Sequence, residues 1–179
     1  QGTAPATYAI TDVVPTAGSV GTRSLSGAVF ALNDVWWISN AGVHALATVQ
    51  QFGDLRETFA SARIGAYFLP GTGITLSINN LNLAVSAYDS QQGRLYFAVD
   101  STANAQNDTL LVLDLGLGAW SVWPNQSIAS MWPVYSTSSG LVELYAGGYD
   151  GHIRAFNRDI ATNAADGHVR HLSCLNSPG

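Results

Sequence analysis

Apolar and polar positions alternate along this chain in short runs, and three stretches repeat the same pattern. Each repeat is an aromatic strand, a turn of small or polar residues, and a second apolar strand; the repeats occupy residues 35–46, 95–114 and 144–157. Their aromatic and β-branched content favours strands over helices. Recurring strand–turn–strand units predict a fold assembled from similar antiparallel sheets.

The spacing of the repeats points to propeller-like sheets of unequal length. The matching aromatic residues are Trp36, Tyr96 and Tyr145, and four-stranded propeller blades run about 40–50 residues each. The first interval is longer than this, and residues 51–64 lie within it. Four apolar residues recur there at a spacing of three to four, which predicts one short amphipathic helix: Phe52, Leu55, Phe59 and Ala62. We therefore expect an all-β fold of propeller-like antiparallel sheets, a partial or small propeller, with one short inserted helix.

The chain divides into three parts on the same grounds. Residues 1–17 are expected to form an N-terminal arm or entry strand, and residues 18–157 the propeller-like β domain. Residues 158–179 are more polar and are expected to form a C-terminal tail, or a closing strand near residues 168–172. The 179 residues are enough for one domain with a substantial core.

Charge is scarce, and this limits the functions that the chain can have. Charged residues make up 11% of the sequence, against about 25% in a typical soluble domain. There is no lysine, and seven arginines face twelve acidic residues, for a net charge of −5. This argues against a protein that binds and recognises nucleic acid, because such a protein needs a basic face. It is compatible with the wall of a channel through which DNA passes without binding. No apolar run approaches the roughly 20 residues of a membrane span.

Motifs that carry chemistry are weak throughout. His168, His171 and Cys174 have metal-like spacing, but structural zinc sites need four ligands. Residues 104–109 lack the acidic residues and the glycine of an EF-hand calcium loop, so a solvated loop is expected. No nucleophile elbow, phosphate-binding loop or dinucleotide fingerprint is present. We therefore expect no metal, no cofactor, no catalytic residue and no enzymatic activity.

Tryptophan is the most informative residue type that remains. Trp36 and Trp37 are adjacent, so in a strand they face opposite sides, and Trp120 and Trp123 do the same. Most of these rings are expected to fill the core between sheets. Trp37, Trp120 and Trp132 are the candidates for an interface or for stacking against a sugar ring.

The order of these pieces carries a resemblance to a known family. Residues 145–157 resemble a propeller hairpin with an Asp-Gly turn, and segments 20–25, 33–46, 87–99 and 111–123 precede it in order. This series is similar to the propeller portions of tailed-phage virion proteins, notably the tail nozzle or tail tubular proteins of short-tailed phages. The resemblance covers roughly residues 18–157.

The resemblance implies a structural role. It implies a virion protein of the phage tail or head-to-tail region, assembled in the host cytoplasm as a ring of identical subunits. Other tail or connector proteins would be its neighbours, and DNA would be only passing cargo during ejection. Two alternatives stay open: a carbohydrate-binding β-propeller module that uses exposed tryptophans, and a hydrolase whose paired carboxylates the sequence does not reveal.

Overall fold

The protein is an all-β structure of three antiparallel sheets. The computed structural model describes residues 21–49, 54–68, 80–137 and 140–156, and within them eleven strands form two four-stranded sheets and one three-stranded sheet. The first sheet comprises β1 (Ala28–Ala31), β2 (Asp34–Ser39), β3 (Gly42–Val49) and β4 (Asp54–Phe59). The middle sheet comprises β5 (Val85–Asp89), β6 (Arg94–Val99), β7 (Thr109–Asp114) and β8 (Ala119–Trp123). The last sheet comprises β9 (Ser130–Ser136), β10 (Leu141–Gly147) and β11 (Ile153–Ala155).

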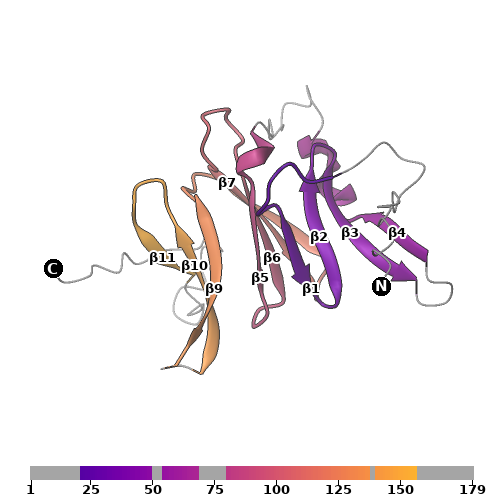
Figure 1. Cartoon of the computed structure of the whole chain (residues 1–179). Helices are drawn as coiled ribbons and strands as arrows, with labels where there is room; N and C mark the ends of the chain where they lie inside the picture. Colours follow the sequence, from indigo (N-terminus) through magenta and orange to yellow (C-terminus); the bar gives the residue numbers. More distant parts are fainter. Residues whose placement is uncertain (1–20, 50–53, 69–79, 138–139, 157–179) are drawn as a thin grey trace, which may run out of the picture.

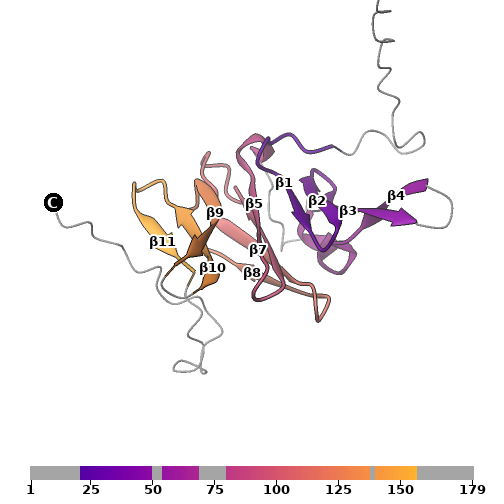
Figure 2. The same cartoon turned by 60° about the horizontal axis from the view of Figure 1, so that its bottom comes forward.

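The strands of every sheet follow one another in chain order, so each sheet is a meander. The three sheets stand side by side, with the middle sheet between the other two (Figure 1). The first strand of each sheet, which we call its opening strand, lies next to the others: β5 contacts both β1 and β9. Strands β11 and β4 lie toward the two opposite sides of the stack, as the second view shows (Figure 2).

Hydrogen bonds fix the first sheet against the middle one near β1. The Ser86 backbone N–H donates to the Ser26 carbonyl at 2.7 Å, and the Ser86 hydroxyl donates to the same oxygen at 2.8 Å. The buried Ser24 hydroxyl donates to the Ala84 carbonyl at 2.6 Å. The loop before β1 is therefore held to the entry of β5.

Two apolar cores separate the sheets. The first lies between the first and middle sheets and includes Ile38, Val43, Phe97 and Leu111. The second lies between the middle and last sheets and includes Tyr96, Leu110, Met131 and Leu144. The middle sheet is buried on both faces, which explains why the run from Leu95 to Val99 is apolar throughout instead of alternating.

The sequence repeats have a structural counterpart. Each repeat supplies the second and third strands of its sheet: β2 with β3, β6 with β7, and β10 with β11. The repeats are therefore equivalent hairpins, and the prediction of an all-β fold of antiparallel sheets is confirmed.

The equivalent hairpins also face the same way. Trp36 and Tyr96 each pack against the sheet that follows in the chain. We call this the leading face of a sheet, and the face turned to the preceding sheet its trailing face. In β6, Leu95 and Phe97 flank Tyr96 and lie on the trailing face, toward the first sheet. In β10, Leu144 and Ala146 flank the equivalent Tyr145 in the same way.

The predicted helix at residues 51–64 is wrong over most of its length. Asp54–Phe59 is strand β4, which pairs antiparallel with β3, and the only helical structure nearby is a 3₁₀ segment, η1 (Ala62–Phe68). Leu55 and Phe59 are four residues apart, a spacing that puts two side chains on one face of a strand as well as of a helix. The segment can hydrogen-bond to the free edge of β3, and this pairing makes it a strand instead of a helix.

Residues 81–89 alternate apolar and polar for several positions, a pattern that on its own favours one strand. Leu81–Leu83 forms a second 3₁₀ segment, η2, and the strand begins only at Val85. Residues 74–78 have a composition that also favours a strand, but they lie outside the described residues. The same holds for the predicted arm (1–17), the tail or closing strand (158–179) and the cluster of His168, His171 and Cys174.

Candidate functional site

A concavity opens where the opening strands of the three sheets meet. Its volume is about 660 Å³, and β1, β5 and β9 supply most of its wall. None of the residues that line it is charged. Four serine hydroxyls and three aromatic rings are its chemically distinctive groups: Ser26, Ser86, Ser90, Ser130, Phe30, Tyr88 and Trp132.

Trp132 is the candidate tryptophan that this concavity brings to the surface. It lies on β9, lines the concavity, and is 73% exposed. Because its neighbour Met131 points into the core beneath, the alternation of the strand turns Trp132 away from the middle sheet. The ring therefore stands at the junction of the concavity and the leading face of the last sheet.

Trp37 and Trp120 lie elsewhere, so the three candidates do not form one site. Trp37 is half-buried on the trailing face of the first sheet and stacks on His44 with ring centroids 5.4 Å apart. Trp120 is half-buried against the first core and donates its indole N–H to the Ala60 carbonyl at 3.3 Å. Trp36 with Trp37, and Trp120 with Trp123, do face opposite sides of their sheets.

The leading face of the last sheet is an apolar surface with no sheet of the described residues packed on it. The register of β9 with β10 places Trp132 opposite Tyr145, and Val134 opposite Glu143. Exposed apolar side chains dominate this face: Trp132, Val134, Leu141 and Ile153. The sequence gives one indication of this open face. Tyr145 occupies the repeat position of Trp36 and Tyr96, and the rings of those two residues are each covered by the sheet that follows.

One acidic residue interrupts this leading face. The Tyr145 hydroxyl donates to Glu143 Oε2 at 2.9 Å, and this hydrogen bond raises the pKa of the Tyr145 hydroxyl. Both side chains are half-buried. The carboxylate is thus already engaged within its own sheet.

The trailing face of the first sheet is the corresponding surface at the other end of the stack. Phe30 is 66% exposed and lies opposite Val35, which is also exposed. Trp37 follows on the same face, with the buried His44 beneath it. Ser39 Oγ and His44 Nε2 are hydrogen-bonded at 2.7 Å, which fixes the imidazole under the Trp37 ring.

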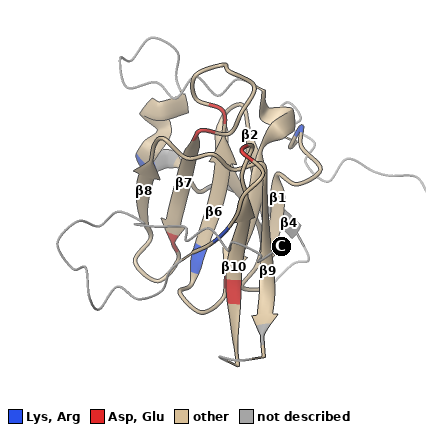
Figure 3. Ribbon diagram, turned by 90° about the vertical axis from the view of Figure 1, so that its left-hand side faces the viewer, with Lys and Arg blue, Asp and Glu red and all other residues tan. Residues whose placement is uncertain are grey.

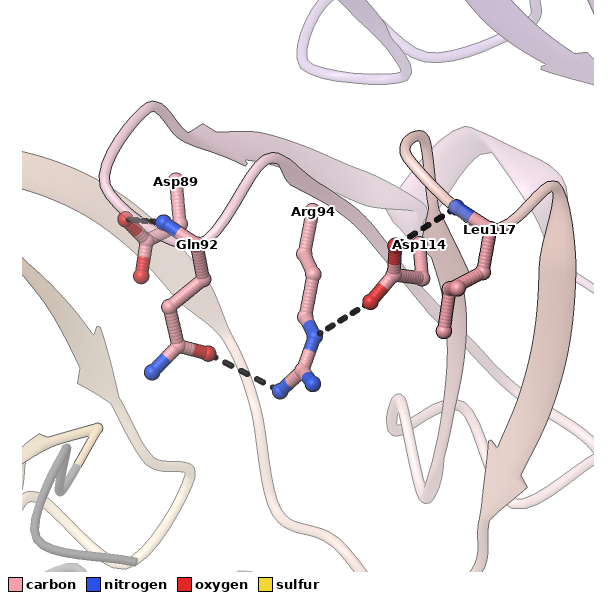
Figure 4. A network of polar contacts seen from close by, with 5 residues as sticks. All are labelled: Asp89, Gln92, Arg94, Asp114 and Leu117. Atoms are coloured by element: carbon pink, nitrogen blue, oxygen red, sulfur yellow. Dashed lines mark hydrogen bonds and ion pairs between the residues drawn. The ribbon is translucent and has the colours of Figure 1, made fainter.

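The charged residues lie mainly in loops and at strand ends, as Figure 3 shows. One such group is drawn in Figure 4. Arg94 Nε contacts Asp114 Oδ2 at 3.3 Å, and Arg94 Nη1 donates to Gln92 Oε1 at 2.9 Å. The Leu117 backbone N–H, hydrogen-bonded to the other Asp114 oxygen, is the main cause that lowers the pKa of Asp114. This network joins the β5–β6 and β7–β8 turns, and it presents no free acid or base.

The loop between β6 and β7 is organised by two carboxylates. Asp100 is buried and accepts backbone N–H groups from Thr102, Asn104 and Ala105 and the Asn80 side-chain amide. Asp108 accepts the hydroxyls of Ser101, Thr102 and Thr109. Partial burial raises the pKa of Asp108, but the hydrogen bonds from Ser101 and Thr102 outweigh it and the pKa is lowered.

These carboxylates therefore face hydrogen-bond donors of their own loop and, for Asp100, also the side chain of Asn80. Over the described ranges, no group of three or more His, Cys, Asp or Glu residues is arranged to hold a metal ion. None of the helical segments that the structure describes has the length and apolar character to cross a bilayer.

A scan against protein-family models finds no matching family, and a search of curated proteins finds no significant match. The functional conclusion accordingly rests on the sheets, their two outer faces and the concavity between their opening strands.

Proposed function

We propose that this chain is a structural protein of a tailed-phage virion, a tail nozzle, tubular or head-to-tail component that contributes to an oligomeric ring around the DNA channel. The observation that supports the proposal most directly is the pair of outer sheet faces. Phe30 and Val35 at one end, and Trp132, Val134 and Ile153 at the other, leave a propeller-like stack open on both sides. Exposed apolar faces of this kind mark interaction surfaces.

The scarcity of charge supports the same role. Solvent-facing strands normally carry polar and charged residues. Here only 11% of all residues are charged, and the charged residues coloured in Figure 3 lie mostly at turns. The residues that line the concavity are also uncharged, so they would not attract a polyanion. The order of the sequence motifs, which is similar to that of phage tail proteins, gives the proposal its particular setting.

Immunogold labelling of purified phage particles that encode this chain tests the proposal. An antibody raised against the recombinant chain should label the tail or its junction with the head. Absence of the chain from particles that eject DNA normally would refute a virion role.

A second candidate is recognition of a neutral carbohydrate in the concavity, and the chemistry of its wall favours that ligand. Serine hydroxyls next to an exposed indole are groups that hydrogen-bond and stack on a sugar ring. A glycan array with unmodified protein and Trp132→Ala separates the two functions, with Trp120→Ala as the matched control because Trp120 lies away from the concavity. Binding that needs Trp132 but not Trp120 would favour the carbohydrate module.

A further inference from the structure

The direction of packing between the sheets is the same at both interfaces of the chain. At the first interface the leading face of the first sheet, with Trp36 and Ile38, meets the trailing face of the middle sheet, with Phe97 and Leu111. At the second, Tyr96 and Leu110 of the middle sheet meet Leu144 and Ala146 of the last sheet. The chain therefore uses one kind of contact twice, leading face on trailing face.

The two outer faces are the unmatched halves of that same contact. The last sheet presents a leading face, with Tyr145 at the position that Trp36 and Tyr96 occupy in their sheets. The first sheet presents a trailing face, on which Val35 and Trp37 flank Trp36 as Leu95 and Phe97 flank Tyr96. Each face is the type that the other would pack against.

Charge is sparse on the two faces of this contact. Glu143 is the one charged residue among the described side chains of the leading face, and Tyr145 already binds it. On the trailing face, the described side chains of β1, β2 and β3 that point outward are Ala28, Phe30, Val35, Trp37, Ser39, His44 and Leu46. None of them carries a carboxylate, although the pairing of β3 with β4 places Glu57 next to Leu46 on the same face of the sheet.

The number of sheets limits how many copies can close a ring. Propellers contain about 4–8 sheets around their axis, and the described residues of one copy form three. Two copies supply six, whereas three copies would supply nine. A pair related by a two-fold axis buries both leading and both trailing faces and leaves none open, as closed symmetry requires.

We propose that two copies of this chain associate head to tail, the leading face of each last sheet on the trailing face of the partner's first sheet, and close one six-sheet propeller. The inference deepens the proposed function and rests on its premise that the chain is an assembly module. The concavity of each copy would then be one half of the channel along the propeller axis.

Sedimentation equilibrium of the purified chain tests the pairing. The expected particle has twice the 18.9 kDa mass of the chain. Trp132→Arg and Phe30→Asp are each expected to raise the dissociation constant of the pair by about 30-fold or more. This is the effect of losing an aromatic anchor at an interface. Leu117→Arg is the matched control, because Leu117 is exposed but lies in the β7–β8 turn and not on either face.

Mixing the two variants distinguishes this arrangement from other dimers. A copy with Trp132→Arg keeps its trailing face, and a copy with Phe30→Asp keeps its leading face, so the mixture retains one unmodified contact and should dimerise more tightly than either variant alone. A dimer of two last sheets would survive Phe30→Asp alone, and a dimer of two first sheets would survive Trp132→Arg alone. Either result would overturn the inference.

Two further outcomes also count against the pairing. An unmodified chain that stays monomeric at about 100 µM, or that forms only assemblies larger than a pair, refutes it. Immunogold labelling of the virion is independent of these masses, so failure of the pairing and failure of the proposed function can be told apart. Circular dichroism confirms that each variant is folded, and Ile153→Arg with Val35→Asp replaces the first pair if either variant unfolds.

Discussion

Phe97 is the residue whose removal tests the packing of the middle sheet most sharply. Its side chain has 0% exposure, lies in the core against the first sheet, and has its ring centroid 6.5 Å from that of Trp120. Truncating a fully buried phenylalanine to alanine costs about 3–5 kcal/mol, from lost transfer free energy and the cavity left behind. We expect Phe97→Ala to fall in the upper half of that range, because strands pack on both sides of this sheet and limit its collapse.

Urea unfolding followed by tryptophan fluorescence measures this loss. With an m-value of about 2 kcal/mol/M, a loss of 4 kcal/mol lowers the midpoint by about 2 M. Leu117→Ala, at a side chain that is 77% exposed, is the control and should change the free energy of unfolding by less than about 0.5 kcal/mol. If Phe97→Ala leaves no folded protein, Phe97→Leu should cost about 1 kcal/mol. A loss below about 1 kcal/mol for Phe97→Ala would refute the buried interface between the sheets.

Three other changes probe the loops that join the strands. Asn107→Ala should lower the free energy of unfolding in urea by about 1–3 kcal/mol, because the buried Asn107 amide donates to the Leu83 and Ile128 carbonyls at 2.8 and 2.9 Å. Asn82 is exposed, so Asn82→Ala should change this free energy very little. Equal losses for the two variants would contradict the role of the Asn107 amide. The folded-state pKa of Asp108 lies below the usual value of an aspartate. Its stabilising contribution is therefore present above the unfolded-state pKa and is lost as the pH falls through the folded-state pKa. The melting temperature should therefore fall on acidification below about pH 4, and less steeply in Asp108→Asn; an unchanged slope would exclude Asp108 as a contributor. Gly93→Ala should lower the free energy of unfolding by about 1–2 kcal/mol because Gly93 has φ +64°. Gly65→Ala is the control and should not lower it, because Gly65 has open space around it and no positive φ. Equal thermal stability of the two variants would argue against strain at the β5–β6 turn.

The hairpins were predictable because their signal is local. Aromatic and β-branched residues surround short turns of small or polar residues at 35–46, 95–114 and 144–157, and the structure places a hairpin at each. The turn before β2 shows the limit of this signal. Asn33-Asp34 marks the turn correctly, but Leu32 and Asn33 are the residues with positive φ, and Asp34 already belongs to the strand. A tight hairpin of this kind selects its turn residues by backbone twist as well as by residue type.

Strand β4 was not predictable from its own residues. The segment Asp54–Phe59 has an acidic start, and its apolar residues are four positions apart, so helix and strand are both compatible with it. The deciding interaction is the pairing with β3, a contact outside the local window. Tertiary pairing of this kind regularly overrides weak local propensity.

The exposure of the candidate tryptophans could be predicted only in part. Adjacent residues on a strand must face opposite sides, which separates Trp36 from Trp37 without any structure. The alternation does not say which side is covered, because that depends on the neighbouring sheet. The structure covers Trp120 with the first sheet and leaves Trp132 at the open end, and these two residues look alike in the sequence.

The stack described here has the energetics of a repeat array without caps. Each sheet of such an array buries its faces against its neighbours, and terminal units normally carry a polar outer face that keeps the array soluble. Here the terminal leading face carries Trp132 and Ile153, and the terminal trailing face carries Phe30. Among the described residues, both terminal faces therefore retain the apolar character of the internal ones. In the proposed head-to-tail pair, each of these faces would be covered by the complementary face of the partner copy.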